Sequence, residues 1–288
     1  MRSWKSWFAL FLVAFSLSAL AQEKLDQTTT AKKVIPGDVF FGLPNDEWDQ
    51  FIICNGSMSP TPKFGSVPMK LAFVDSSGRV CHLNWLKDQV DSPESGLCEL
   101  FCLFEKIGGY VFQAKEKCPN APVPDDELSG SYRTTILLVS EDYLKTHTPL
   151  KVIKYPPKPL SKKICRKIEK TRGMKLRGTS NIATLENGSI YAVVWFETFK
   201  EKNIFSTVLI SKHKLVFDDE EDDGEINWMY KGEANEDAFE ILAAFKSSSG
   251  IDIARMTPGY EGLDSVFVRQ NGAIFEFVAA NAFYAGGF

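Results

Sequence analysis

Short runs of apolar, β-prone residues alternate with turn residues along most of this chain. The dipeptide Asn-Gly occurs at 55–56, 187–188 and 271–272, and each copy is flanked by such runs. A two-residue type I′ turn needs positive φ at both central positions, which Asn and Gly adopt most readily. A fourth turn signal at 75–78 has similar flanks. The pattern predicts a mostly β protein of antiparallel hairpins, propeller-like or a sandwich, with a few short helices.

Two apolar segments fit either a helix or a strand. Residues 97–107 form a helix, or a strand that turns at the glycine pair following them. Residues 235–246 begin with Asn235, a good N-cap, and carry acids in the first turn, yet the run 239–245 suits a strand equally well. Periodicity alone does not separate the two readings.

The first 21 residues predict a secretory signal peptide, 1–21, that is cleaved from the mature chain. Arg2 and Lys5 precede an uncharged apolar run of 14 residues, 7–20, and an Ala-Leu-Ala cleavage pattern closes the segment. A membrane anchor needs about 20 apolar residues. We therefore expect a secreted or periplasmic protein that does not span a membrane after cleavage.

The overall charge argues against a nucleic-acid partner. The full chain has a formal net charge of −4, and cleavage would remove two basic residues to leave −6. A mildly acidic chain has no global electrostatic attraction for a polyanion such as DNA.

Six cysteines follow the leader, and an exported chain with an even number of cysteines typically forms disulfides. The spacing matches no zinc motif. A proline-rich stretch, 155–159, separates the first five cysteines from a part in which Cys165 is the last one, so that the final 123 residues have none. We expect a disulfide-stapled β-rich domain, 22–155, and a cysteine-poor β-rich domain, 156–288. The disulfide candidates are Cys54, Cys81, Cys98, Cys102, Cys118 and Cys165.

Charge is strongly segregated in the second half of the chain. Residues 151–177 contain eleven basic residues and one acid, whereas 217–240 contain eleven acids and one base. One interpretation is a pair of solvated surfaces that face one another. The other is a basic docking patch for anionic lipid, polysaccharide or an acidic protein, built on an amphipathic helix over 161–168 with Ile164 and Ile168 inward. The candidate patch residues are Lys162, Lys163, Arg166, Lys167 and Lys170.

The segment 219–227 has the phasing of an EF-hand calcium loop. Oxygen ligands stand at loop positions 1, 3, 5 and 9, and Gly224 supplies the turn at position 6. The loop departs from the motif at position 12, which is Tyr230, and its flanks suit strands. The alternative is a solvated acidic hairpin tip, and no other cofactor is predicted. The candidate calcium ligands are Asp219, Glu221, Asp223 and Asn227.

Near the C-terminus, residues 239–277 follow an order of strand, loop, short connection and hairpin. The loop 247–252 is rich in Ser and Gly and ends in Asp252, and 259–262 reads Gly-Tyr-Glu-Gly. This order resembles FG-GAP-type repeat modules of exported bacterial proteins, in which an Asp-rich loop holds calcium. The loop here has a single acid, so the resemblance implies no ligands. It implies a strand over 236–245 and a propeller-like C-terminal part.

The sequence has no HExxH helix, no GxSxG elbow, and no phosphate or dinucleotide loop, and its SxxK match at 211–214 lies in a β-like, lysine-rich stretch where the pattern is common by chance. We therefore expect an exported non-catalytic binding protein whose partner is an unknown protein or envelope polymer. The alternative is an exported hydrolase of cell-envelope or extracellular polymers, whose cleft would be lined by tryptophans. Those tryptophans are Trp48, Trp85, Trp195 and Trp228.

Overall fold

A computed structural model provides the fold. The described residues all belong to one compact unit, 35–288, so the predicted signal peptide lies outside them. The structure describes residues 37–54, 58–59, 67–92, 103–118, 134–197, 203–212, 214–222, 240–258 and 262–284.

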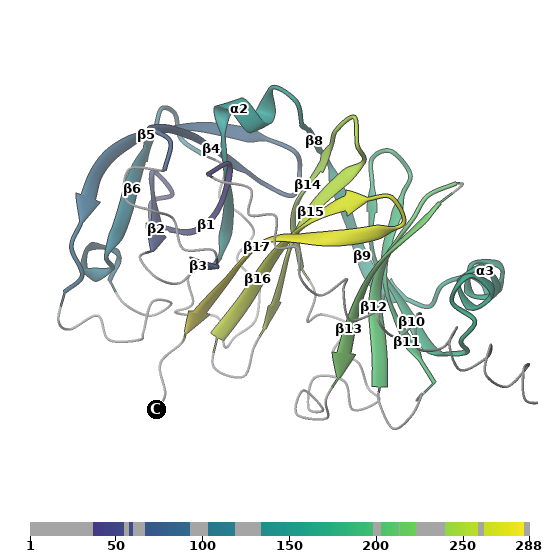
Figure 1. The fold of residues 1–288 in the computed structure, drawn as a ribbon. Coiled ribbons are helices and arrows are strands. Elements are labelled where there is room, and N and C mark those ends of the chain that lie inside the picture. The colour runs from purple at the N-terminus through teal and green to yellow at the C-terminus, as the bar shows by residue number, and fades with distance from the viewer. Residues whose placement is uncertain are drawn as a thin grey trace, which may run out of the picture. The chain divides into compact units, whose positions relative to one another are not determined.

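The N-terminal strands form a closed six-stranded antiparallel barrel (Figure 1). These strands are β1 (Val39–Pro44), β2 (Gln50–Cys54), β4 (Lys70–Val74), β5 (Val80–Gln89), β6 (Gly109–Ala114) and β7 (Ile136–Ser140). Around the barrel their order is β1-β2-β6-β5-β4-β7, and β7 pairs with β1 to close it. Closure removes the unpaired edges that an open sheet would expose.

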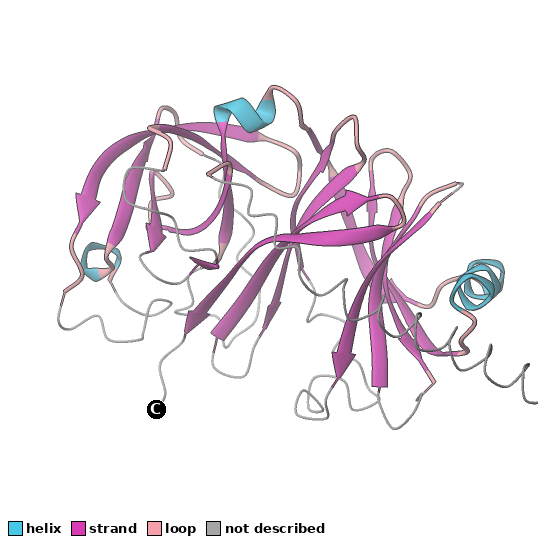
Figure 2. Ribbon diagram, in the orientation of Figure 1, coloured by secondary structure: helices cyan, strands magenta, loops and turns pink. Residues whose placement is uncertain are grey.

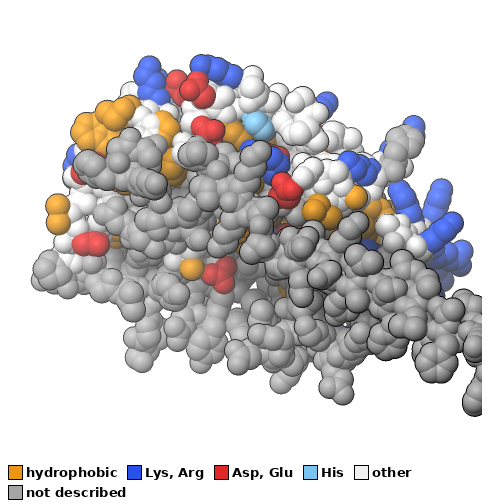
Figure 3. Space-filling model, viewed as in Figure 1, with side chains coloured by type: hydrophobic (Ala, Val, Ile, Leu, Met, Phe, Trp, Pro, Cys, Tyr) orange, Lys and Arg blue, Asp and Glu red, His pale blue; other side chains and the backbone are white. Residues whose placement is uncertain are grey.

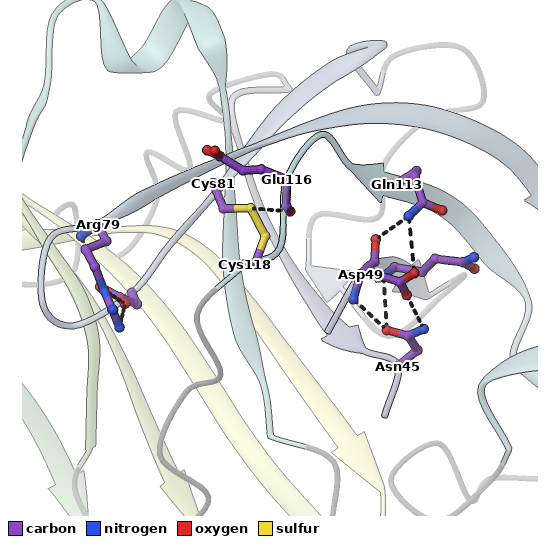
Figure 4. The surroundings of a disulfide bond; sticks show 9 residues. Asn45, Asp49, Arg79, Cys81, Gln113, Glu116 and Cys118 are labelled. Atoms are coloured by element: carbon purple, nitrogen blue, oxygen red, sulfur yellow. Dashed lines mark hydrogen bonds and ion pairs between the residues drawn. A yellow bond between two sulfur atoms is a disulfide. The ribbon is translucent and has the colours of Figure 1, made fainter. Parts of the chain in front are cut away.

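Local side-chain hydrogen bonds shape the barrel's tight turns. The turn predicted at 75–78 is confirmed as the β4–β5 connection, where Asp75 Oδ1 accepts the backbone N–H groups of Ser77 and Arg79. In the β1–β2 loop, Asn45 Oδ1 accepts the backbone N–H of Asp49 at 3.1 Å (Figure 4). Such Asx contacts are the reason that Asp and Asn favour turns.

The remaining strands build a second sheet of eleven strands. They are β3 (Met58–Ser59), β8 (Thr148–Leu150), β9 (Val152–Lys158), β10 (Leu176–Leu185), β11 (Ile190–Phe196), β12 (Asn203–Ile210), β13 (Leu215–Asp222), β14 (Glu240–Lys246), β15 (Ile251–Pro258), β16 (Gly262–Asn271) and β17 (Ile274–Tyr284). The order is β8-β14-β15-β16-β17-β13-β12-β11-β10-β9, with β3 on β17. Only Lys151 separates β8 from β9, so the two ends of the sheet adjoin and ten strands nearly close a second barrel.

The two Asn-Gly hairpins predicted at 187–188 and 271–272 are confirmed. Gly188 has φ +82° between β10 and β11, and Gly272 has φ +63° between β16 and β17. The segment 235–246 could be a helix or a strand from its sequence, and its described part, 240–246, is strand β14. The Asn55-Gly56 turn and most of 97–107 lie outside the described residues.

Helices are few and short (Figure 2). The described helices are α2 (Glu141–Leu144), α3 (Lys162–Arg172) and the 3-10 turn η2 (Phe104–Lys106). No described helix is long and apolar enough to cross a membrane.

Apolar residues fill three cores. The first lies in the six-stranded barrel and includes Phe41, Phe51 and Phe112; it extends to Phe245 and Phe267 of the second sheet. The second core lies inside the second sheet. On β14 and β16 its residues, Ala244 and Val268, are next to Phe245 and Phe267 in sequence and so point to the opposite face of the sheet. The third, which we call the helix core, lies between α3 and the second sheet. Its residues are Leu160, Ile168, Ala192, Val194, Phe196, Val208, Ile210, Leu215 and Phe217.

The fold class is confirmed as mostly β, but the propeller and sandwich readings are wrong. Propeller blades are separate four-stranded sheets, whereas β14–β17 here continue into β13 and the rest of one curled sheet. The proline-rich stretch 155–159, where the sequence predicts a domain boundary, covers the second half of β9 and the residue after it. Along the chain, β7 of the first barrel is followed by α2 and then by β8 of the second sheet.

Candidate functional site

Helix α3 is the element that carries the predicted basic patch, and local signals set both its ends. Ser161 is the N-cap, and its hydroxyl accepts the backbone N–H of Ile164. Gly173 ends the helix with φ +67° and donates its N–H to the carbonyl of Glu169 at 2.8 Å. The helix predicted over 161–168 is therefore confirmed and runs one turn further.

The inward face of α3 attaches it firmly to the second sheet. Ile168 is fully buried in the helix core. Arg172 forms an ion pair with Asp219 of β13, and its guanidinium lies 4.9 Å from the ring centre of Phe217 and 5.9 Å from that of Phe196. Cation–π contacts of this kind stabilise a folded cation in addition to its ion pair. The helix is thus held by apolar packing at its middle and by a paired arginine at its end.

The outward face of α3 carries five exposed cations, and we call it the basic face. All five side chains are exposed, and none forms an ion pair within the described chain. By contrast, Arg172 is paired with Asp219, and Lys175 lies 3.7 Å from Glu169. Figure 3 shows Lys and Arg side chains spreading outward over α3. The basic face consists of Lys162, Lys163, Arg166, Lys167 and Lys170.

The five cations fall on one side of the helix because of their spacing. At about 100° per residue they cover an arc of about 140°, and every α3 position within that arc is Lys or Arg. Three pairs stand four residues apart, and like charges at this spacing repel by about 0.2–0.5 kcal/mol each. Lys162 and Lys163 also occupy the first turn, where the helix dipole disfavours cations. Both effects oppose folding, whereas Lys170 is favoured by the dipole because it stands in the last turn.

The two charge blocks of the sequence meet at the second sheet. Arg172 binds Asp219, and Lys154 of β9 binds Glu240 of β14, so each pair joins the basic block to the acidic block. This agrees in part with the interpretation that the blocks face one another. Most of the acidic block, 223–239, lies outside the described residues.

The candidate calcium ligands are only partly placed. Asp219 and Glu221 lie on strand β13, and Asp219 accepts a hydrogen bond from Ser206 besides its ion pair with the arginine of α3. Asp223 and Asn227 lie outside the described residues. Among the side chains that the structure describes, no group of three or more His, Cys, Asp or Glu is placed to hold a metal ion.

One predicted disulfide is present. Cys81 of β5 is bonded to Cys118, which follows β6, and both are buried (Figure 4). The bond spans 37 residues of sequence and fastens β5 to the segment after its neighbour β6.

The other candidate cysteines have different surroundings. Cys54 is buried on β2. Cys165 is half-buried on α3, where its thiol donates to the Leu160 carbonyl oxygen at 3.6 Å and is not bridged. Cys98 and Cys102 lie outside the described residues.

A second cluster of polar residues was not foreseen from the sequence, and it centres on the fully buried Asp252. Its Oδ2 accepts the hydroxyl of Tyr143 at 2.8 Å and Nε of Arg269 at 2.9 Å, while Nε2 of His147 lies 3.5 Å away. Burial, and then the negative charge of Asp252, raise the pKa of the Tyr143 hydroxyl. The cluster fastens α2 and the residues after it to the β15–β16 hairpin.

Only tertiary structure brings this cluster together. Asp252 and Arg269 are cross-strand partners of β15 and β16, and Tyr143 stands 109 residues before Asp252. Asp252 is also the last residue of the Ser- and Gly-rich loop 247–252, and its Oδ2 atom already accepts hydrogen bonds from protein donors. A Tyr hydroxyl held neutral acts as a hydrogen-bond donor and not as a base.

The tryptophans proposed for a hydrolase cleft are dispersed. Trp48 is buried in the first barrel, with its ring centre 5.9 Å from that of Phe73. Trp85 is exposed on β5, whereas Trp195 is half-buried on β11 against the core of the second sheet. Trp228 lies outside the described residues.

The chain was compared with known protein families, curated proteins and solved structures. No protein family, no curated protein and no solved structure matches the chain.

Proposed function

We propose that this chain is an exported, non-catalytic interaction protein that docks an anionic partner through the basic face of α3. The observation that carries the proposal is a firmly attached helix with five exposed cations, none of which has an ion-pair partner among the described residues. Uncompensated charge of one sign raises the local potential and attracts partners of the opposite sign.

The energetic cost of the arrangement supports a binding role. Repulsion between neighbouring cations and an unfavourable helix dipole both act against the folded state. By contrast, Arg172 at the end of the same helix is paired with Asp219 and so helps to hold the helix on the sheet. Departures from local stability rules concentrate at functional sites.

The rigid attachment of α3 also suits docking. Ile168 is fully buried and Arg172 is paired, so the helix is ordered before any partner arrives. A preformed surface avoids the entropic cost of ordering on binding. The long lysine side chains still lose freedom, so we expect moderate affinity that depends strongly on salt.

The test compares two variants with the same change in net charge. In the first, all five cations of the basic face are replaced by Gln. In the second, five exposed lysines elsewhere are replaced by Gln; they are Lys70, Lys87, Lys117, Lys212 and Lys246. Binding is measured on immobilised anionic vesicles, a sulfated polysaccharide and a polyglutamate, and circular dichroism and thermal melting confirm that both variants fold.

We expect the basic-face variant to lose at least about tenfold in affinity for one or more of these probes, and the control variant to retain wild-type affinity. Binding by the wild type should weaken as salt is added, because screening shortens the reach of exposed charges. Equal binding by both variants on every probe would contradict the proposal.

A further inference from the structure

We infer that the partner of the basic face is a flexible, linear anionic polysaccharide that lies along α3. The inference rests on the proposed function and specifies its partner. It follows from the curvature of the basic face, from the burial of the helix's apolar side, and from the spacing and type of the cations.

The basic face is convex. An α-helix with its side chains is a cylinder about 10–12 Å across, and the five cations spread over about 140° of it. A flat surface such as a bilayer touches only the crest of such a ridge. A flexible chain follows the curvature and reaches the cations on both flanks.

The positions of the cations on the helix separate crest from flank. At about 100° per residue, Lys163, Arg166 and Lys170 lie within about 30° of the centre of the arc. Lys162 and Lys167 lie about 70° away on opposite sides. A partner that engages all five must therefore bend around the helix.

The apolar side of α3 is already used. Ile168 is fully buried in the helix core, and Ile164 packs against the same core. Helices that bind membrane surfaces insert their apolar side among the lipids and gain much of their affinity from it. Helix α3 has no exposed apolar side to insert, so a bilayer would meet charge alone.

The spacing of the cations suits a polymer with regularly repeated charges. Lys162, Arg166 and Lys170 form a row that rises about 6 Å per step along the axis. A sugar ring with one carboxylate or sulfate has a comparable length. Four of the five cations are lysines, which bind as hydrated point charges and do not require the fixed bidentate geometry of an arginine site.

A convex basic helix also fits the groove of a nucleic acid, but the rest of the chain opposes that partner. The full chain has a net charge of −4, and its acidic block approaches α3 through Asp219. A stiff, highly charged duplex would meet this negative charge, whereas a flexible polysaccharide can remain on the helix.

The experiment measures affinity by isothermal titration for four probes: heparin, polygalacturonate, duplex DNA, and vesicles of equal parts phosphatidylglycerol and phosphatidylcholine. Two double variants with equal charge change are compared with the wild type. K163Q/K170Q alters the crest of the basic face, and K162Q/K167Q alters the flanks. The Lys87→Gln, Lys212→Gln double variant is the control.

For heparin or polygalacturonate we expect crest and flank variants to lose affinity equally, to within about twofold, while the control stays unchanged. The wild type should bind the polysaccharide at least about tenfold more tightly than vesicles or DNA at equal charge concentration.

Two results would overturn the inference and leave the proposed function intact. One is tighter binding to vesicles or DNA that still depends on the basic face. The other is polysaccharide binding that is weakened by the crest variant only. If no probe distinguishes the basic-face variants from the control, the inference and the proposed function both fail.

Discussion

At the scale of single residues, Tyr143 shows how the fold changes the chemistry of a side chain. Its ring stacks on His147, with ring centres 3.9 Å apart, and its hydroxyl donates to the fully buried Asp252. Ionising this hydroxyl in the folded protein would place two negative charges side by side away from water. Burial and Asp252 therefore raise its pKa and keep it protonated.

The raised pKa predicts a loss of stability in alkali. The neutral hydroxyl is favoured in the folded state, so the contribution is complete below about pH 10, the ordinary pKa of tyrosine. Above that pH the unfolded chain releases a proton that the folded chain retains, and stability falls by about 1.4 kcal/mol per pH unit. We expect the free energy of unfolding to decline between about pH 9 and pH 11 by about 1 kcal/mol more in the wild type than in Tyr143→Phe.

Denaturant unfolding at each pH measures this difference. At neutral pH the Phe variant should itself be less stable by about 1–3 kcal/mol, because the buried carboxylate loses a donor. Parallel pH profiles for the two proteins would show that Tyr143 is not the titrating group.

The disulfide gives a second prediction at this scale. Replacing both Cys81 and Cys118 by Ser removes a cross-link that spans 37 residues. We expect the free energy of unfolding to fall by about 2–4 kcal/mol, because the unfolded chain regains conformational freedom. Adding dithiothreitol should lower the melting temperature of the wild type more than that of the double variant. An equal effect on both proteins would contradict a stabilising role for this bond.

At the scale of elements, α3 illustrates how far local sequence signals reach. The start of the helix at 161 and the inward position of Ile168 were predicted from local signals, whereas its last turn up to the C-cap Gly173 was not. The five cations of the basic face could be named because helical spacing alone places them together. Only the structure shows that they have no ion-pair partner among the described residues, since an ion pair joins segments far apart in sequence.

The dipole of α3 predicts that the same charge reversal affects stability differently at the two ends of the helix. Lys163→Glu places an acid in the first turn and relieves repulsion with Arg166 and Lys167, so we expect about 0.5–1 kcal/mol of added stability. Lys170→Glu relieves similar repulsion but places an acid in the last turn, so we expect little net change. Chemical denaturation measures both.

Binding should not follow stability in these two variants. Both charge reversals remove a cation from the crest of the basic face, so both should weaken polysaccharide binding to a similar extent. A Lys163→Glu protein that is more stable and binds less would separate folding from function at this helix. Unchanged binding by both variants would argue against docking on α3.

The strands show the same division between local and non-local information. The turns at 75–78, 187–188 and 271–272 were predictable because Asp, Asn and Gly favour those backbone conformations. The segment 240–246 was ambiguous, since its apolar run fits a buried helix as well as a buried strand. Pairing with β8 on one side and β15 on the other decides for the strand.

At the scale of the whole molecule, pairings between distant strands define the architecture. The first barrel closes through β1 and β7, whose paired residues Val39 and Val139 are far apart in sequence. The second sheet joins β13 to β17 through a parallel pairing, Phe217 with Ile274. Hairpin signals do not indicate pairings between strands that are far apart in sequence. The sequence therefore predicted individual hairpins correctly, but its expectation of a propeller or sandwich was wrong.

The sequence by itself determined that the chain is mostly β, where several hairpins turn, and which cations share one helical face, because these depend on neighbours within a few residues. Tertiary structure alone decided that the strands close into a barrel and a nearly closed sheet, that Cys81 bonds Cys118, and that Asp252 meets Tyr143 and Arg269. It also decided that Arg172 is paired with Asp219, whereas the basic face has no ion-pair partner in the part of the chain that the structure describes. These outcomes depend on packing between segments that are distant in the chain, and local preferences carry no record of that packing.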